Sequence, residues 1–583
     1  MSDSIKHECA VTMLRLRKRP EHYLCKYKTE FYGYQKLSLM LEKQHNRGQD
    51  GAGIAGVKLK QEPGCPAWQL EKSARKMPLA HLLERIGAQI ETIKKDHPEQ
   101  LGCYPLAGEL LLGHLRYGTF GIQGEAACHP FIRESSCLNR TLLMAGNFNL
   151  TNTAEIFNSL LETGHHPSSR QDGALILHLI GHYLEQALMQ QQQPDVTAVL
   201  KRAAESFDGA FTLCGIFGDG HAFALRDASG IRPAFYYVND EAAVVASERP
   251  AIQTAFDLFP EQVQELPPGH ALSIDRDGEV EIRLCLDPKP VRKCVFERIY
   301  FSRGNDAEIH QERKAMGRAL VPNVLKNLDD GIENAFVSYI PNTAQICFHG
   351  MLEELMKMQL NKPLRFGQIA VKDAKFRTFI SDAVAREDFS MHVYDVTYGL
   401  IRPGLDTLIV IDDSIVRGNT IHNAILPMLD RLSPKKIIVA SAAPPICYPD
   451  CYGIDMGSLK ELVAFEALAD LLRSSGQTGF LEQQGVRARA ALKGEAPLAD
   501  PLRELYGAFS FDELVRAITD RLRPAGLKAE LAVVFQTPES LRQCCPGHTG
   551  DWYFTGEYPT PGGYRVVNQA LVNYLEHVNT RAY

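Results

Sequence analysis

Residues 408–420 read LIVIDDSIVRGNT, and this stretch decides the fold class of the second half of the chain. Four apolar residues lead into two adjacent aspartates, and a polar stretch around Gly418 follows them. An apolar run that ends in this way is typical of a strand in a parallel sheet, which is buried on both faces and carries ligand-binding loops at its carboxyl end. Downstream apolar positions at helical spacing predict that the loop leads into a helix, with a kink at Pro427.

Strand-like and helical segments alternate on both sides of this loop. Apolar strands are predicted at 335–340, 407–411 and 435–441, with helical stretches between them. This alternation predicts an α/β domain with a parallel sheet. The first half is rich in short strand-like runs and has few helices, which predicts an α+β layer structure. We therefore expect domains at 9–288 and 289–470, followed by a helical and irregular extension, 471–583, that packs on the second domain.

Composition excludes several classes of protein. The chain has 583 residues, 45% of them hydrophobic, and a formal net charge of -7 without a long basic run. Neither a nucleic acid nor an anionic membrane is expected as a partner. The amino-terminal residues lack the apolar stretch of a secretory signal, and no apolar run approaches membrane-spanning length. These features predict a cytoplasmic protein, in which the fourteen cysteines are expected to be thiols or ligands.

The aspartate loop has the residues of a sugar phosphate site. Asp412 and Asp413 suit ribose hydroxyls or a magnesium ion that bridges to pyrophosphate. The helix start after Gly418 offers backbone N–H groups to a phosphate, and Ser414 and Thr420 add hydroxyls. An acidic loop with a helix cap is the alternative, but it explains only one carboxylate and Thr420.

The sequence VIDDSIVRGNT resembles the PRPP (5-phosphoribosyl 1-pyrophosphate) loop of type I phosphoribosyltransferases, in the form found in the amidophosphoribosyltransferase family. The resemblance implies that Asp412 and Asp413 meet the ribose hydroxyls and Mg²⁺. It implies that the 5-phosphate is bound by the segment that follows, which comprises Ser414, Arg417, Gly418, Asn419 and Thr420.

Two upstream segments extend the resemblance to this family. SYIPNT (338–343) is similar to its pyrophosphate and metal loop, which makes Thr343 a magnesium ligand. VKDAKFRTFI (371–380) resembles the segment that closes over PRPP, which assigns Lys372 to the pyrophosphate.

The first half resembles the class II glutamine amidotransferases, whose N-terminal-nucleophile fold is an αββα sandwich. The resemblance is carried, in chain order, by HECAV, QHNRGQDGAGIAG, GHLRYGTFG and GNFNLTN. In this class an amino-terminal cysteine attacks glutamine, and its own α-amine, with a pKa of roughly 7.7 to 8.0, serves as the base. Cys9 is therefore the expected nucleophile, and residues 1–8 are an expected propeptide.

The same resemblance assigns the other glutaminase residues. Arg116 binds the glutamine α-carboxylate, Asp172 binds its α-ammonium, and Asn147 with the backbone N–H of Phe148 forms the oxyanion hole. Taken singly, Arg116 could form a surface ion pair, Asp172 could cap a helix and Asn147 could serve a turn. Ala10 and Phe148 stand where the family has glycine, which leaves a non-catalytic PRPP or nucleotide sensor with a decayed glutaminase as the alternative function.

Cofactors and partners follow from the family. Mg²⁺ is expected, with Thr343, Asp412 and Asp413 as its ligands. Some members hold an iron–sulfur cluster, but the spacing of the candidate ligands here does not favour one (Cys294, Cys451, Cys544 and Cys545). The resemblance implies glutamine and PRPP as substrates, purine nucleotides as inhibitors, and a homotetramer or homodimer.

Overall fold

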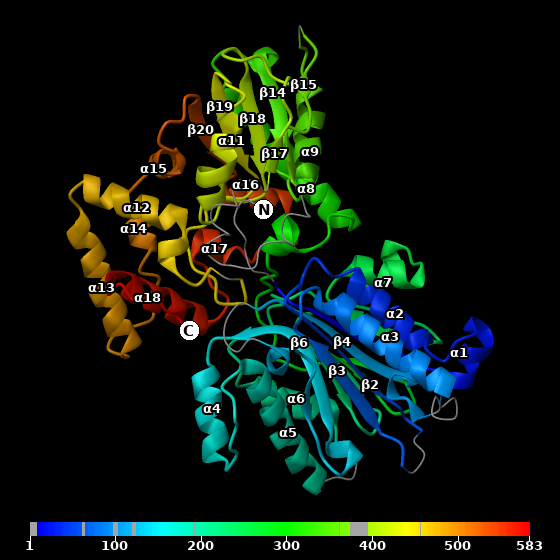
Figure 1. The fold of residues 1–583 in the computed structure, drawn as a ribbon. Helices are drawn as coiled ribbons and strands as arrows, with labels where there is room; N and C mark the ends of the chain where they lie inside the picture. The colour runs from blue at the N-terminus through cyan, green and yellow to red at the C-terminus, as the bar shows by residue number, and fades with distance from the viewer. Residues whose placement is uncertain are drawn as a thin grey trace.

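The structure is a computed structural model that describes residues 8–60, 64–96, 103–118, 124–190, 194–360, 362–372, 394–454 and 456–583. It places two layered domains one above the other, with a group of helices from the carboxyl-terminal part of the chain beside them (Figure 1). Among the residues described, no helix is both long enough and apolar enough to cross a membrane.

The amino-terminal domain consists of two antiparallel sheets packed face to face. The first sheet has the order β11-β9-β10-β1-β4-β2-β3 and the second has the order β13-β12-β8-β7-β6-β5. Strands of the first sheet are β1 (Ala10–Leu16), β2 (Gly51–Val57), β3 (Trp68–Ser73), β4 (Leu110–Arg116), β9 (Phe235–Val238), β10 (Ala242–Ala246) and β11 (Gln264–Glu265). Strands of the second are β5 (Phe131–Arg133), β6 (Leu142–Leu150), β7 (Gly209–Phe217), β8 (Ala222–Arg226), β12 (His270–Ile274) and β13 (Val280–Leu284).

Helices cover the outer faces of these two sheets (Figure 1). The first sheet is covered by α1 (Pro20–Tyr27), α2 (Tyr32–Glu42), α3 (Pro78–Asp96) and α7 (Arg249–Phe256). The second is covered by α4 (Thr153–Glu162), α5 (Asp172–Gln190) and α6 (Val196–Ala204). Buried Val, Leu, Ile and Ala side chains fill the space between the sheets. This is the expected αββα sandwich.

The carboxyl-terminal domain is built on a five-stranded parallel sheet of order β15-β14-β18-β19-β20. Its strands are β14 (Ala335–Tyr339), β15 (Arg365–Phe366), β18 (Thr407–Asp412), β19 (Lys436–Ser441) and β20 (Glu530–Phe535). All six residues of β18 are buried, as expected for a strand covered on both faces. Covering helices include α8 (Ala307–Lys326), α9 (Gln345–Leu355), α11 (Leu426–Asp430), α15 (Phe511–Leu522) and α16 (Pro538–Cys544). The prediction of an α/β parallel-sheet domain is confirmed.

Segment 471–583 differs from the sequence prediction. Much of it is helical, in α13 (Thr478–Leu492), α14 (Arg503–Gly507), α17 (Trp552–Thr555) and α18 (Pro561–Leu575). Helix α13 packs against both α12 (Val463–Ser474) and α18. However, the segment also supplies β20, which pairs with β19 as the fifth strand of the sheet. The sequence prediction of a helical and irregular extension did not include this strand.

Two further local features bear on the sequence predictions. The helix expected after the aspartate loop begins as a π-helical turn, Ile421–Ile425, and becomes α-helical at α11, where Pro427 lies in the first turn. Cys65 and Cys103 form a disulfide, so the expectation of thiols or ligands is wrong for this pair.

A small antiparallel ribbon, β16 (Ala370–Lys372) and β17 (Tyr394–Val396), lies beside the parallel sheet.

Candidate functional site

Cys9 directly precedes β1. Because Ala10 pairs with Leu115, Cys9 is beside the end of β4, where Arg116 stands. Burial raises the pKa of the Cys9 thiol to about 11, although the Tyr117 backbone N–H and the Arg116 guanidinium oppose this rise. A thiol with such a pKa is protonated near neutrality, so it needs a base to become a nucleophile.

Asp172 opens α5 close to the same thiol. Its charge acts on the pKa of Cys9, and its Oδ1 accepts the backbone N–H of Gly173 at 2.9 Å. Burial raises the pKa of Asp172 to about 6, against the opposing effect of backbone hydrogen bonds. The structure thus brings Cys9, Arg116 and Asp172 together from three elements: β1, β4 and α5.

Asn147 reaches the site from β6 of the second sheet. Its Nδ2 donates to Oε2 of Glu8, the residue before the nucleophile, at 3.1 Å. The neighbouring Phe148 ring packs into the helical side of the sheet and stacks on His129 at 5.1 Å between ring centroids. Since successive side chains of a strand point to opposite faces, the Phe148 ring points away from the Asn147 amide.

A pair of histidines holds the backbone just before Asn147. The rings of His114 and His129 stack at 4.0 Å between centroids. His129 Nδ1 accepts the Gly146 N–H at 3.3 Å, and His114 Nε2 lies 3.1 Å from the Gly146 carbonyl oxygen. Burial lowers the pKa of His114 to about 3 and that of His129 well below its usual range, so both rings are neutral.

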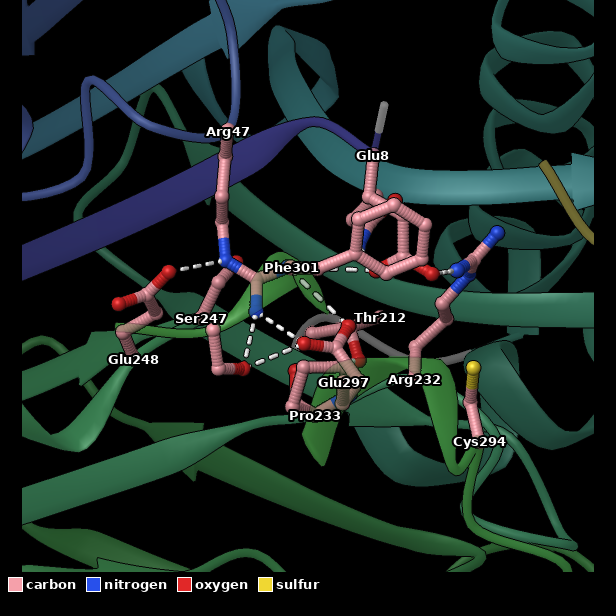
Figure 2. Close-up of polar contacts among 12 residues, drawn as sticks. Glu8, Arg47, Thr212, Arg232, Pro233, Ser247, Glu248, Cys294, Glu297 and Phe301 are labelled. Carbon is pink, nitrogen blue, oxygen red and sulfur yellow. Dashed lines mark hydrogen bonds and ion pairs between the residues drawn. The ribbon is translucent and has the colours of Figure 1, made fainter. Parts of the chain in front are cut away.

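Glu8 sits in a buried network that joins the two domains (Figure 2). Its carboxylate forms ion pairs with Arg47 and Arg232. Arg47 also pairs with Glu297 and donates to the hydroxyl of Ser302 at 2.9 Å, both of which belong to the entry of the second domain. The sequence motifs assigned none of these five residues a role. The only sequence signal for this network was the presence of an arginine in QHNRGQ and another in SGIRP. A motif does not reveal whether such a side chain is buried, so the sequence did not predict the network.

The aspartate loop leaves the carboxyl edge of the parallel sheet, as predicted. Asp412 ends β18, and both it and Asp413 are buried. The Asp413 N–H donates to Asp412 Oδ1 at 3.0 Å, and Ser414 Oγ donates to Asp413 Oδ1 at 3.3 Å. Burial raises the pKa of Asp413, while Arg313 and Ser414 oppose the rise. Two carboxylates and a hydroxyl therefore stand together at the end of this strand.

Gly418 gives the loop its shape. Its φ is +76°, in the left-handed region that favours glycine, and a Cβ there would lie 2.4 Å from Leu522 Cδ2 of α15. Arg417 is turned to Glu461, with Nη2 2.7 Å from Oε2. Asn419 is exposed and Thr420 is half-buried.

The other predicted PRPP residues lie on neighbouring strands. Tyr339 of β14 pairs with Ile411, so the loop that carries Thr343 leaves the sheet at the same edge as the two aspartates. The backbone of Lys372 ends β16. Residues 373–380 of the predicted closing segment lie outside the described residues.

Comparisons with known proteins agree with both halves of this description. The family model of the glutamine amidotransferase domain matches residues 119–254. The amidophosphoribosyltransferase of Pasteurella multocida is 29% identical over 452 residues, which cover 74% of this chain and 80% of that protein. The amidophosphoribosyltransferase of Escherichia coli is 28% identical over 487 residues, which cover 80% of this chain and 86% of that protein. The chain resembles the amidophosphoribosyltransferases over most of its length.

Two solved structures share the fold. The glutamine PRPP amidotransferase from B. subtilis, complexed with ADP and GMP, matches with a TM-score of 0.64 at 21% identity and covers 95% of this chain and 97% of its own. A structure described as the allosteric regulatory enzyme of purine biosynthesis matches with a TM-score of 0.65, also at 21% identity, and covers 95% of this chain and 96% of its own.

The cysteines do not fit the iron–sulfur cluster of some family members. Such a cluster is held by four thiolates. Among the residues described, no three His, Cys, Asp or Glu side chains are arranged to hold a metal ion. Cys294 Sγ instead lies 2.6 Å from the Tyr553 hydroxyl, and burial raises the pKa of Cys294 to about 12. Cys544 and Cys545 lie at the end of α16, and the Cys451 carbonyl accepts a hydrogen bond from Asn149.

The aspartate pair does fit a magnesium ion of the family's kind. Mg²⁺ usually keeps several waters and is held by one or two carboxylates together with substrate phosphates. Asp412 and Asp413 supply two carboxylates at the sheet edge where ligands of open α/β sheets bind.

Proposed function

We propose that this protein transfers ammonia from glutamine to PRPP, giving 5-phosphoribosylamine, glutamate and pyrophosphate, the first committed step of de novo purine synthesis. One observation carries this proposal: a half-buried cysteine beside Arg116 and Asp172 occurs in the same chain as an aspartate loop at the edge of a parallel sheet. The family relationship supports both half-reactions. Nothing favours a non-catalytic sensor.

The glutaminase half begins with removal of residues 1–8. The freed α-amine of Cys9 takes the thiol proton, and the sulfur attacks the amide carbon of glutamine. Arg116 binds the α-carboxylate, Asp172 binds the α-ammonium, and Asn147 with the Phe148 N–H stabilises the tetrahedral oxyanion. Ammonia leaves, and water then hydrolyses the thioester to glutamate and free thiol.

The transferase half uses the ammonia as its nucleophile. Segment Ser414–Thr420 binds the 5-phosphate, Asp412 and Asp413 hold the ribose hydroxyls and the metal, and Thr343 with Lys372 orients the pyrophosphate. Bound Mg²⁺ would neutralise the charge that develops on the departing pyrophosphate. Ammonia forms the bond to C1 of the ribose as the bond to pyrophosphate breaks.

Several finer assignments belong to the same proposal. The glutaminase domain comprises 9–288 and the transferase domain begins at 289, with 471–583 completing it through β20. Purine nucleotides inhibit the enzyme at or near the PRPP site, in line with the relative solved with ADP and GMP. The enzyme acts in the cytoplasm as a homotetramer or homodimer.

One assay tests the proposal. Release of glutamate and pyrophosphate is measured with PRPP plus either glutamine or ammonia, for the wild type and for Cys9→Ala. We expect the wild type to use both nitrogen sources and Cys9→Ala to use only ammonia. Cys25→Ala, which removes an exposed thiol of α1, is the matched control and should behave as the wild type. No pyrophosphate from any chain under either condition would support the sensor instead.

The N-terminus has its own test. Intact mass of active, purified enzyme should show a chain that begins at Cys9. Active enzyme that retains residues 1–8 would contradict the α-amine mechanism.

A further inference from the structure

The side chain of Glu8 contacts Arg47, Arg232 and Asn147, and we call the buried space that it occupies the Glu8 pocket. Figure 2 shows Glu8 between Arg47 and Arg232. Oε2 accepts from Arg47 Nη1 at 3.2 Å and from Asn147 Nδ2 at 3.1 Å, and Oε1 forms the ion pair with Arg232. The side chain of Glu8 has 0% exposure, and those of the two arginines have 0% and 1%. Side-chain N–H donors from three residues therefore converge on one carboxylate that is shut off from solvent.

The two arginines depend on Glu8 to different degrees. Arg47 keeps other carboxylate partners, because its Nε donates to Glu248 at 2.7 Å and its Nη2 pairs with Glu297. Arg232 has Glu8 as its one ion-pair partner among the described residues, and its Nε and Nη2 have no hydrogen-bond partner there. Arg232 therefore depends on whatever occupies the pocket.

The nearby Asp450 already accepts hydrogen bonds from other groups. It acts electrostatically with Arg232, but its oxygens accept from Trp552 Nε1 at 2.8 Å and from the backbone N–H groups of Tyr452 and Ile454 at 2.9 and 2.7 Å. Removal of Glu8 would take away the one ion-pair partner of the buried Arg232 guanidinium and leave it only the more distant charges of Asp450 and Glu297. A buried charge that loses its direct partner is strongly unfavourable.

We propose that the Glu8 pocket is an anion site, filled by Glu8 in the precursor and by a small anion, a halide or a formate-sized carboxylate, once residues 1–8 are removed. This rests on the removal of that segment in the proposed function. The donors suit the ligand, because guanidinium and amide N–H groups bind carboxylates and halides through charge-assisted hydrogen bonds.

The bound anion would contact both halves of the enzyme. Asn147 is the proposed oxyanion donor, and Arg47 holds Glu297 and Ser302 at the entry of the transferase domain. An anion in the pocket therefore stabilises the domain junction and fixes the Asn147 amide. Its loss should weaken glutamine-dependent turnover more than ammonia-dependent turnover.

The test uses the full chain with Cys9 as its first residue, released from a cleavable amino-terminal fusion so that natural processing is not needed. Thermal unfolding and both activities are measured in gluconate buffer as bromide or formate replaces gluconate at constant ionic strength. We expect a saturable rise in Tm of about 1–3 °C and a rise of about twofold or more in glutamine-dependent rate. Crystals grown with bromide should show an anomalous peak between Arg47 and Arg232.

Variants separate this site from general salt effects. Arg232→Met should abolish both the saturable rise in Tm and the bromide peak. Arg249→Met, at the same domain junction but paired with Glu308 and Asp306 rather than Glu8, should keep them. Absence of the bromide peak from the wild-type crystal, or an equal Tm response in the wild type and Arg232→Met, would overturn the anion site. A chain that shows the peak but never uses glutamine would instead contradict the proposed function.

Discussion

Replacement of Arg47 by Met tests the buried network that joins the two domains. Arg47 is fully buried and pairs with Glu248 and Glu297 whether or not Glu8 is present. Removing one partner of a buried ion pair typically costs about 3–5 kcal/mol, because the remaining charge is left uncompensated. We therefore expect Arg47→Met to lose about 3–5 kcal/mol of unfolding free energy near neutral pH, measured by urea denaturation with circular dichroism.

The pH dependence of this loss has a definite sign. Burial alone would raise the pKa of Glu297, but Arg47 and Ser302 outweigh burial and hold it below its usual value. In the wild type, Glu297 therefore contributes stability that is lost as the pH falls through its lowered pKa. In Arg47→Met the pKa of Glu297 rises, so acid neutralises the orphaned carboxylate and relieves the cost. The difference between the two proteins should shrink between about pH 7.5 and pH 5.

Two further proteins make this prediction refutable. Arg249→Met removes a junction arginine whose nearer partner, Glu308, is 59% exposed. Its other partner, the buried Asp306, lies 3.7 Å away and keeps its backbone hydrogen bonds at the start of α8, so the cost should be smaller, about 1 kcal/mol. The double variant Arg47→Met/Glu297→Gln should recover part of the loss, since the orphaned charge is gone. A loss below about 1 kcal/mol for Arg47→Met, or a loss unchanged by pH, would refute the reasoning.

Three other predictions concern the two reaction sites. Gly418→Ala should raise the KM for PRPP about tenfold or more while leaving glutaminase turnover intact. The reason is that alanine in the left-handed backbone conformation destabilises the loop by roughly 1–2 kcal/mol, and its Cβ would contact Leu522. Gly479→Ala is the control and should change neither activity, because a Cβ there has no atom within 4 Å. Asp412→Asn and Asp413→Asn should each lower pyrophosphate release about a hundredfold or more in assays with ammonia, and unchanged rates would remove these carboxylates from the site. Glutamine binding by the Cys9→Ala chain, prepared without residues 1–8, should weaken below about pH 6, as Asp172 becomes protonated, whereas the same chain carrying Asp172→Asn should bind weakly at every pH in calorimetry.

The fold was largely predictable because local patterns agreed with the global arrangement. Buried apolar runs such as β18 have no solvent-facing residues, and short alternating strands in the first half pointed to layered sheets. β20 was missed because its sequence, ELAVVF, begins with a charge and is separated from β19 by a long helical segment. Pairing between such distant segments leaves no local periodicity to detect.

The candidate site was predictable where residues are consecutive and less so where they converge. The loop from Asp412 to Thr420 is one continuous segment, so its residue types alone suggested a sugar phosphate ligand. Glu8, Arg47 and Arg232 come from three segments, and their partnership depends on burial that only the folded chain creates. Arg417 shows that the residue types of a continuous motif do not fix side-chain direction. Its motif implied a phosphate ligand, whereas in the structure its guanidinium donates to Glu461.

The position of β20 also has a consequence for how the chain is made. β19 gains its outer partner only after segment 442–529 has been synthesised, which takes roughly 4–18 s at about 5–20 residues per second. During that interval the hydrogen-bonding groups of β19 form an open sheet edge, which is a template for pairing with another chain. A product that stops before Glu530 would keep this edge permanently. Aggregation during translation, rather than loss of any catalytic group, is then the first defect expected of carboxyl-terminal truncations.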